Sequence, residues 1–230
     1  MIPVKRILTK SKEPLTSTVV VDEFVKASEK AFDCKFNGRS EFYGWELPDD
    51  ELLKDFSIGV IVGGSGTGKS TLLKVFGSEY EPYWEPYKAI VSHFNSPDDA
   101  INKLSAVGLN TVPSWYKQYQ VLSNGEKFRA DLARKVKNGA VIDEFTSVVD
   151  RTVAKAASVA LSRYIKKNNL KNIVVSTCHY DIVEWLQPDW VINTDTGHLY
   201  DGFFLSDQKS ISKYIRPTVV SGECLKTITI

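Results

Sequence analysis

Short apolar runs rich in β-branched residues alternate along most of the chain with segments of helical periodicity. The apolar runs predict buried strands at residues 57–62, 89–91, 140–142, 173–177 and 190–193. The segments between them predict helices at residues 69–76, 97–107, 124–136 and 152–167. This alternation predicts an α/β fold in which helices cover a mostly parallel sheet.

The first 50 residues follow a different pattern. Residues 1–17 are polar and contain two prolines, and we expect them to form a loose N-terminal arm. Three short runs follow, and they predict strands at residues 18–25, 32–36 and 41–47. These strands indicate a small antiparallel β subdomain beside the main sheet.

Length and composition fit one globular domain. A chain of 230 residues can bury a sizeable core, and its 43% hydrophobic and 25% charged residues are ordinary for a globular protein. We expect residues 18–230 to form a single domain with a short helical lobe at about 95–137. The 29 Lys and Arg balance the 28 Asp and Glu, which excludes a uniformly basic nucleic-acid coat but not a local basic patch.

The sequence indicates a reducing, cytoplasmic location. The three cysteines (Cys34, Cys178 and Cys224) are odd in number and far apart, which favours free thiols over a disulfide framework or a zinc site. No apolar run approaches the roughly 20 residues that a membrane-spanning helix needs. The charged start is not followed by the apolar stretch of a secretory signal. We therefore expect no contact with a membrane.

The most specific motif is a glycine-rich loop between the first predicted strand and helix of the α/β region. It reads Gly63-Gly64-Ser65-Gly66-Thr67-Gly68-Lys69-Ser70 and fits G-x-x-x-x-G-K-[ST] at every fixed position. The N–H groups of such a loop surround phosphates, Lys69 would neutralise the β- and γ-phosphates of ATP, and Ser70 would bind Mg²⁺. We expect the loop and the adjoining Thr71 to bind ATP, as in P-loop NTPases. The alternative is a glycine-rich turn that contains Lys and Ser by coincidence.

Two acidic residues follow the predicted strand at 140–142. Asp143 would hold Mg²⁺ through Ser70 or through water. Glu144 is one residue further along, where a carboxylate can position and polarise an attacking water or hydroxyl. Without a phosphate loop, the plainer interpretation would be two solvated acids at a strand end.

A second possible anion site begins the predicted helix at 124–136. Ser123 and Glu126 form the S-x-x-E pattern of a capping box. The same helix start, with Gly125 leaving the backbone accessible, could bind a phosphate. The two interpretations do not exclude each other.

Aromatic residues precede and follow the phosphate loop. We expect Tyr43 to stack on adenine, although core packing is as good an interpretation for Tyr43, Phe42 or Trp45. The stretch at residues 80–87 contains four aromatic residues and two turn-forming prolines. It fits a packed loop, with a docking surface or a platform for bases as alternatives.

Taken together and in order, these motifs resemble those of an ATP-binding-cassette ATPase. The resemblance covers residues 18 to 205 approximately. It assigns Walker A to residues 63–70, the signature loop to 122–126, Walker B and its following glutamate to 140–144, the D-loop to 147–150, and the switch histidine to His179.

The resemblance implies an ATP-dependent homodimer in which two copies pair head to tail. ATP bound at Lys69 of one copy would be completed by Ser123 and Gly125 of the other, with Asp150 at the same interface. It also implies that His179 acts in catalysis beside Lys69 and Glu144.

Residues 143–155 and 178–190 resemble a non-transporter branch of this family. In that branch the cassette is commonly joined to an acyltransferase of the GNAT type. The chain is similar to free-standing cassettes of phages and bacteria, which would place a phage-encoded protein in the host cytoplasm. The implied partners are an acyltransferase or another modifying enzyme, and DNA.

The sequence departs from the family pattern in four places. Asn124 stands where many signature loops have glycine, and Glu126 where glutamine is usual; both changes look tolerable. The segment after residues 89–91 has no glutamine, and His93 either takes that place or is structural. The segment from His93 to Leu122 is short for the lobe on which membrane subunits dock, which disfavours transport.

Three functions remain in view. The first is an ATP hydrolase that switches by dimerisation, with Glu144 activating water, and that serves a DNA- or protein-modifying partner. The second is a kinase that transfers the γ-phosphate to a nucleotide or to a modified base in phage DNA. The third is a slow binding module for another enzyme. The signature loop and His179 favour the first, and no arginine-rich lid of the kind found in nucleotide kinases stands out.

Overall fold

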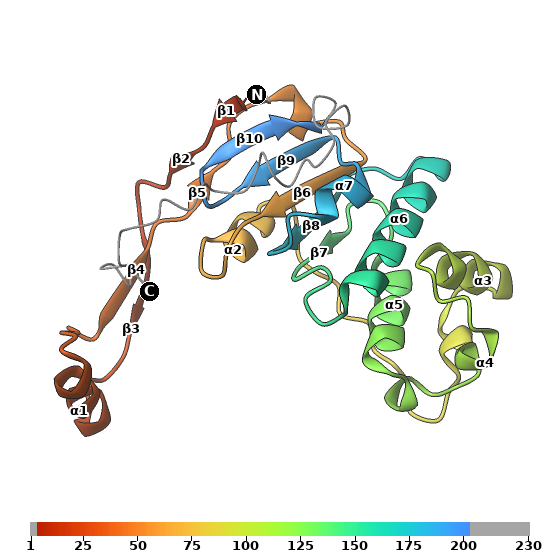
Figure 1. Ribbon diagram of the computed structural model, residues 1–230, viewed down its shortest axis with the longest axis horizontal. Coiled ribbons are helices and arrows are strands. Elements are labelled where there is room, and N and C mark those ends of the chain that lie inside the picture. Colours follow the sequence, from red (N-terminus) through yellow and green to blue (C-terminus); the bar gives the residue numbers. More distant parts are fainter. Residues whose placement is uncertain (1–3, 203–230) are drawn as a thin grey trace.

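A six-stranded mixed sheet forms the centre of the structure, a computed structural model that describes residues 4–202 (Figure 1). The strands β9, β6, β8 and β7 pair in parallel, and β10 is antiparallel to both of its neighbours. The predicted α/β fold is confirmed, while residues 203–230 of the predicted domain, including Cys224, lie outside the described residues. The strand order is β1 (Val4–Ile7), β10 (His198–Asp201), β9 (Trp190–Asn193), β6 (Ile58–Val62), β8 (Ile173–Thr177) and β7 (Val141–Ile142).

Helices cover both faces of this sheet because side chains alternate along each strand. On one face, Val60 and Val175 pack in a core with residues of α5 (Asn124–Lys135), α6 (Arg151–Lys167) and α7 (Ile182–Leu186). On the other face, Ile61 and Val174 pack with Leu72 and Leu73 of α2 (Lys69–Leu73). The helix predicted at residues 69–76 is therefore correctly placed but shorter.

Between residues 95 and 137 the chain forms helices that stand beside the sheet, α3 (Pro97–Ala106), α4 (Val112–Trp115) and α5 (Figure 1). The strand predicted at residues 89–91 is wrong, because this segment is a 3-10 turn, η2 (Ile90–His93), and a second such turn, η3 (Tyr119–Val121), precedes α5. No helix within residues 4–202 has the length and apolarity required to cross a bilayer.

The aromatic stretch at residues 80–87 packs onto α5, and Trp84 is its one buried side chain. Trp84 is buried, its ring stacks on Tyr119 with centroids 5.0 Å apart, and its Nε1 donates to Asp131 at 2.7 Å. Tyr83 and Tyr87 of the same stretch are exposed. The packed-loop interpretation therefore holds for Trp84.

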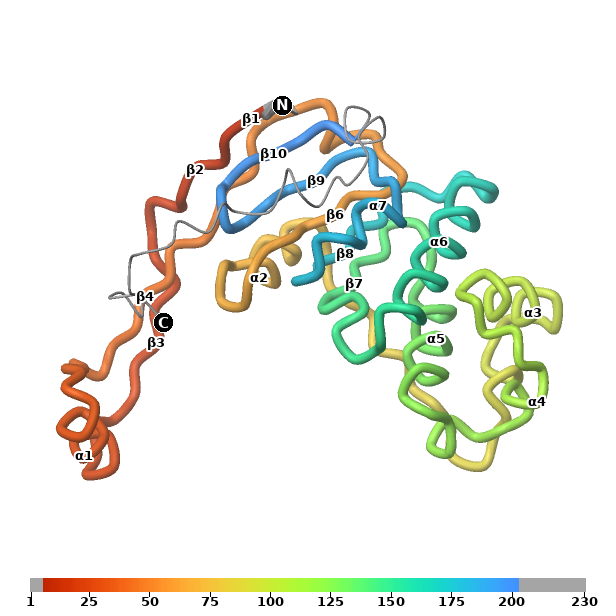
Figure 2. The backbone as a smooth tube through the Cα atoms, in the orientation of Figure 1, coloured from red at the N-terminus to blue at the C-terminus, as the bar shows by residue number. Residues whose placement is uncertain are grey.

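The N-terminal region forms a long arm that runs out from the sheet and back (Figure 2). It consists of two antiparallel pairs, β2 (Thr9–Lys10) with β5 (Trp45–Glu46) and β3 (Leu15–Thr18) with β4 (Arg39–Phe42). The prediction of a loose arm over residues 1–17 is wrong for residues 4–17, because β2 and β3 pair within the arm and β1 joins the main sheet. The predicted antiparallel strands are present, and they form an extended ribbon.

A helix at the far end of the arm replaces two predicted strands. The strands predicted at residues 18–25 and 32–36 are wrong, because α1 (Glu23–Phe32) takes the end of the first segment and begins before the second, and residues 19–22 and 33–36 form no strand. Asp22 caps it by accepting from the N–H of Val25 at 2.9 Å, and Asp33 ends it with φ of 50°. No residue of α1 is buried. After the arm, the 3-10 turn η1 (Glu51–Leu53) leads into β6.

Candidate functional site

The glycine-rich loop joins the carboxyl end of β6 to the start of α2. Gly68 has φ of +94°, a left-handed value that suits glycine, and a Cβ atom there would lie 2.6 Å from Cζ of Phe42. Lys69 folds back over the loop, and its Nζ donates to the carbonyl of Gly64 at 2.5 Å. Residue 68 therefore needs a glycine both for its backbone angle and for the close approach of Phe42.

Three side chains from distant parts of the sequence hold this loop. Trp45 donates from Nε1 to the carbonyl of Thr67 at 3.0 Å, and the hydroxyls of Thr67 and Thr194 are 2.6 Å apart. Asp195 accepts from the N–H of Gly64 at 2.9 Å. The loop is thus fixed by the arm on one side and by the turn between β9 and β10 on the other.

A cavity of about 440 Å³ opens over the loop. It brings the predicted phosphate-binding and acidic residues together in one place. Its lining consists of Phe42, Ser65, Gly66, Gly68, Lys69, Ser70, Thr71, Asp143, Glu144, Ser147 and Cys178.

Asp143 lies at the end of β7 with its carboxylate directed to hydroxyl groups. Ser176 and Ser70 donate hydrogen bonds to it, and the N–H of Glu144 donates to Oδ1 at 2.8 Å. Burial favours the neutral carboxyl, but these hydrogen bonds outweigh burial and hold the pKa of Asp143 below its ordinary value. An ionised carboxylate beside the Ser70 hydroxyl fits Mg²⁺, which takes few protein ligands when phosphates supply the others.

Glu144 emerges from the strand in an unusual backbone conformation. Its φ is +46°, Thr146 follows with φ of +68°, and such angles are uncommon for residues with side chains. The N–H of Phe145 donates to the carbonyl of Ser176 at 2.8 Å and fixes the turn. As a result, the exposed Glu144 side chain lines the cavity over the loop.

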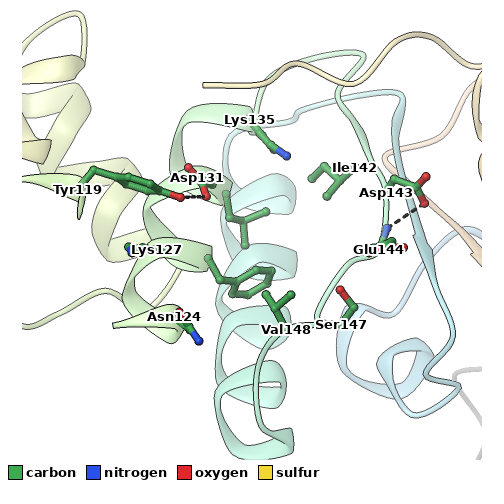
Figure 3. A pocket seen from close by; sticks show the side chains of 12 residues that line it. Tyr119, Asn124, Lys127, Asp131, Lys135, Ile142, Asp143, Glu144, Ser147 and Val148 are labelled. Carbon is green, nitrogen blue, oxygen red and sulfur yellow. Dashed lines mark hydrogen bonds between the residues drawn. The ribbon is translucent and has the colours of Figure 1, made fainter. Parts of the chain in front are cut away.

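A second cavity, of about 380 Å³, lies on the other side of Glu144 (Figure 3). It separates α5 from the segment that follows β7. Asp143, Glu144 and Ser147 line both cavities. A carboxylate at this boundary can reach a molecule in either one.

His179 lies directly after Cys178, which lines the cavity over the loop, but it is not itself part of the lining. Its ring is partly buried. Burial lowers the pKa of His179, the charge of Arg151 lowers it further, and Asp181 opposes both. The predicted switch histidine thus directly follows a residue of the cavity lining, and its lowered pKa favours the neutral ring.

Ser123 and Gly125 lie at the start of α5 and do not line the cavity over the loop. The predicted capping box is confirmed, since Ser123 and Glu126 cap each other's N–H groups. Hydrogen bonds from the Ser114 hydroxyl and from Ser123 lower the pKa of Glu126 to about 2. The helix start is therefore preorganised, but within one chain it is not part of the phosphate site.

The aromatic residue that lines the cavity is Phe42 and not Tyr43. The side chain of Tyr43 is 43% exposed, and its carbonyl accepts a hydrogen bond from Lys10 at 3.2 Å. Phe42 contacts Gly68, as described above. The preference for Tyr43 among the three aromatic residues is thus not supported by the geometry, and Phe42 takes its place as the candidate for base stacking.

His93 holds its own loop together and does not line either cavity. Its Nε2 accepts from the N–H of Glu85 at 2.9 Å, its Nδ1 is 3.0 Å from the carbonyl of Ala89, and its ring contacts Trp84 edge-on. Both ring nitrogens are engaged, so the neutral ring carries its proton on Nδ1. Of the two alternatives left by the sequence, the structural role is the one that the geometry supports.

We expect the protein to lose stability as the pH falls below about 6.5, the ordinary pKa of histidine. Burial lowers the pKa of His93 in the folded protein, so the unfolded chain binds more protons in this pH range. Acidification therefore favours the unfolded state and removes the contribution of His93 to the free energy of unfolding. The thermal midpoint should fall by about 1–3 °C between pH 7 and 5.5. In His93→Gln this part of the fall should be absent; an identical pH profile would contradict the assignment.

Several site residues were not found from the sequence. Thr194, Asp195 and Ser176 contribute to the site through pairings that only the sheet order creates. A usable signal did exist for two of them. The polar cluster that follows the strand at 190–193 had to lie at the carboxyl edge of a parallel sheet, where ligands bind.

Comparison with known proteins supports the fold. No family model and no curated protein matches the chain. A dimeric post-hydrolysis state of the ATP-binding cassette MJ0796, bound to ADP and Pi, matches with a TM-score of 0.50 and 15% identity, over 88% of this chain and 95% of that chain. A metal-chelate type ABC transporter in an inward-facing conformation matches with a TM-score of 0.50 and 18% identity, over 72% and 79% of the chains. The chain therefore has the P-loop α/β fold of the ATP-binding-cassette ATPases.

Proposed function

We propose that the protein binds ATP with Mg²⁺ and hydrolyses it as a nucleotide-dependent homodimer. The observation that carries this proposal is the shared cavity of the phosphate loop, Asp143 and Glu144. In this assignment, Lys69 and the loop N–H groups bind the phosphates, and Ser70 and Asp143 hold the metal ion. Glu144 takes a proton from the attacking water.

His179 is the proposed switch residue of the same site. It directly follows Cys178 of the cavity lining, its pKa is lowered, and a neutral imidazole can still donate a hydrogen bond to a γ-phosphate. Phe42 is the proposed platform for the adenine ring. Thr71 completes the cavity next to Ser70.

The position of Ser123 and Gly125 supports the proposed homodimer. Their helix start is held in place by the capping box, but it does not line the phosphate site of its own chain. A second copy placed head to tail would bring this helix start to the γ-phosphate. The similar cassette MJ0796 is a dimer bound to ADP and Pi, which supports a dimer for this chain but does not bear on its geometry.

We expect the Glu144→Gln protein to be monomeric without nucleotide and dimeric in saturating ATP. The γ-phosphate would supply negative charge for two opposing helix starts, and ADP lacks this group. Sedimentation with ATP, with ADP and without nucleotide measures the change. A protein that stays monomeric in ATP would contradict the dimer.

Substitutions of Ser123 distinguish its proposed role at the dimer interface from its role as the N-cap of α5. Ser123→Asp keeps a capping side chain but brings a carboxylate toward the γ-phosphate, so it should prevent dimerisation. Ser123→Asn keeps the cap without the charge and should weaken dimerisation less. Ile101→Arg, on an exposed face of α3, serves as the control and should dimerise normally. ATP affinity of the monomer should be unchanged in all three.

The acceptor of the γ-phosphate distinguishes the hydrolase from the kinase. We propose water as the acceptor, and a DNA- or protein-modifying partner, such as an acyltransferase of the GNAT type, as the recipient of the conformational change. The test is incubation with γ-labelled ATP, Mg²⁺, nucleotides and DNA. Label recovered only as inorganic phosphate supports the hydrolase, whereas label in DNA or a nucleotide would move the assignment to the kinase.

A further inference from the structure

The segment that carries His179 is attached to the start of α6 by a two-pronged ion pair. Arg151 is the first residue of α6, and its Nε donates to Oδ2 of Asp181 at 3.1 Å while its Nη2 donates to Oδ1. The guanidinium also lies over the ring of Trp185, with its carbon 5.0 Å from the centroid. Carboxylate and indole together fix the guanidinium in one orientation.

Asp181 gives up a local role to make this ion pair. It occupies the N-cap position of α7, where an aspartate usually accepts from the helix N–H groups. Here its side chain makes no capping hydrogen bond, and its carboxylate is engaged by Arg151. A contact that displaces a helix cap indicates that the position of Asp181 relative to α6 matters.

A second attachment ties the same segment to the phosphate loop. Tyr180 donates from its hydroxyl to Oδ2 of Asp195, and Oδ1 of Asp195 accepts from the N–H of Gly64. His179 therefore directly precedes two anchored residues. Tyr180 is anchored toward the phosphate loop, and Asp181 toward the helix that follows Glu144 in the sequence.

We propose that Arg151 is a positioning residue that couples the segment after Glu144 to His179 through Asp181. The proposal rests on the function proposed above. When a partner copy contacts the residues before α6, including Asp150, a shift of α6 is transmitted to Asp181 and thus to His179. The α6 start is rigid enough for this, because Asp150 accepts from the N–H groups of Thr152 and Val153 at 2.8 and 3.0 Å.

Hydrogen exchange tests the attachment without relying on activity. The first amides of α7 donate to the carbonyls of His179, Tyr180 and Asp181, so they report on this segment. In Arg151→Ala these amides should exchange about 10-fold faster, because a charge-assisted pair no longer holds the segment. Arg163→Ala, a second arginine on α6 that is exposed, serves as the matched control and should leave them unchanged.

Kinetics distinguish positioning from a general loss of structure. Arg151→Ala should lower kcat by about 10-fold with KM and ATP affinity unchanged, because His179 is misplaced while the phosphate loop is intact. Arg151→Lys keeps the positive charge but cannot donate two parallel hydrogen bonds to the carboxylate, so it should recover only part of the rate. The exchanged pair Arg151→Asp with Asp181→Arg should recover more of the rate than either single change.

The results separate the two proposals. Wild-type exchange and kcat in Arg151→Ala would overturn the positioning role while leaving the hydrolase intact. A wild-type protein without ATPase activity would overturn the hydrolase, and the exchange experiment would still report whether Arg151 holds the segment.

Discussion

Replacing Glu144 with glutamine should slow phosphate release from ATP by about 100-fold or more, the usual scale for the loss of a general base. The amide keeps the shape of the side chain at the boundary of the two cavities but cannot take a proton from water. ATP should still bind, because the phosphate loop, Ser70 and Asp143 are unchanged. Single-turnover release of labelled phosphate gives the rate, and calorimetry gives the affinity.

The matched control for this substitution is Glu23→Gln on α1. It makes the same chemical change on an exposed residue of the arm, and it should leave the rate unchanged. Turnover of Glu144→Gln at the wild-type rate would show that Glu144 is not the catalytic carboxylate. Loss of ATP binding in this variant would instead assign Glu144 a role in the ground state.

Lys69→Ala should raise the Kd for ATP by about 10- to 150-fold, the range expected for losing a charge-assisted contact worth about 1.5–3 kcal/mol. The loop N–H groups remain, so binding should be weakened and not abolished. Lys74→Ala removes an equal charge from an exposed position one turn further on and is the control. Unchanged ATP affinity in Lys69→Ala would refute the phosphate-loop assignment.

A thiol reagent offers an independent measurement of the same binding. Cys178 is exposed and lines the cavity, whereas Cys34 is exposed on the arm. In a Cys224→Ser background, ATP should protect Cys178 and leave the labelling of Cys34 unchanged. Protection should require more ATP in Lys69→Ala than in the wild-type protein.

The central sheet and the phosphate site could be predicted because their signals are local. The strands at 173–177 and 190–193 were placed correctly from apolar β-branched runs, which identify strands buried on both faces. The phosphate loop and the acids after β7 carry fixed spacings. Their meeting in one cavity follows from the parallel arrangement, since the carboxyl ends of these strands share one edge of the sheet.

The arm could not be predicted because its pairings are not local. β1 pairs with β10, which lies near the other end of the described residues. No local sequence pattern predicts a partner so distant in the sequence. Residues 18–25 contain three consecutive valines, which favour a strand, but Asp22 caps a helix at this point. The lysines and glutamates of residues 23–30 favour that helix. Their helix propensity decides the structure of this segment because no neighbouring strand among the described residues pairs with it.

The arm has almost no core of its own, yet its inner end supplies Phe42 and Trp45 to the phosphate loop. Energetic coupling between two events is reciprocal. A ligand that packs on Phe42 therefore stabilises the paired state of the ribbon by the same free energy by which that pairing strengthens binding. A ligand in the cavity would therefore reduce the opening of the strand pairs in the ribbon. It would also reduce the motion of α1 at the far end of the ribbon.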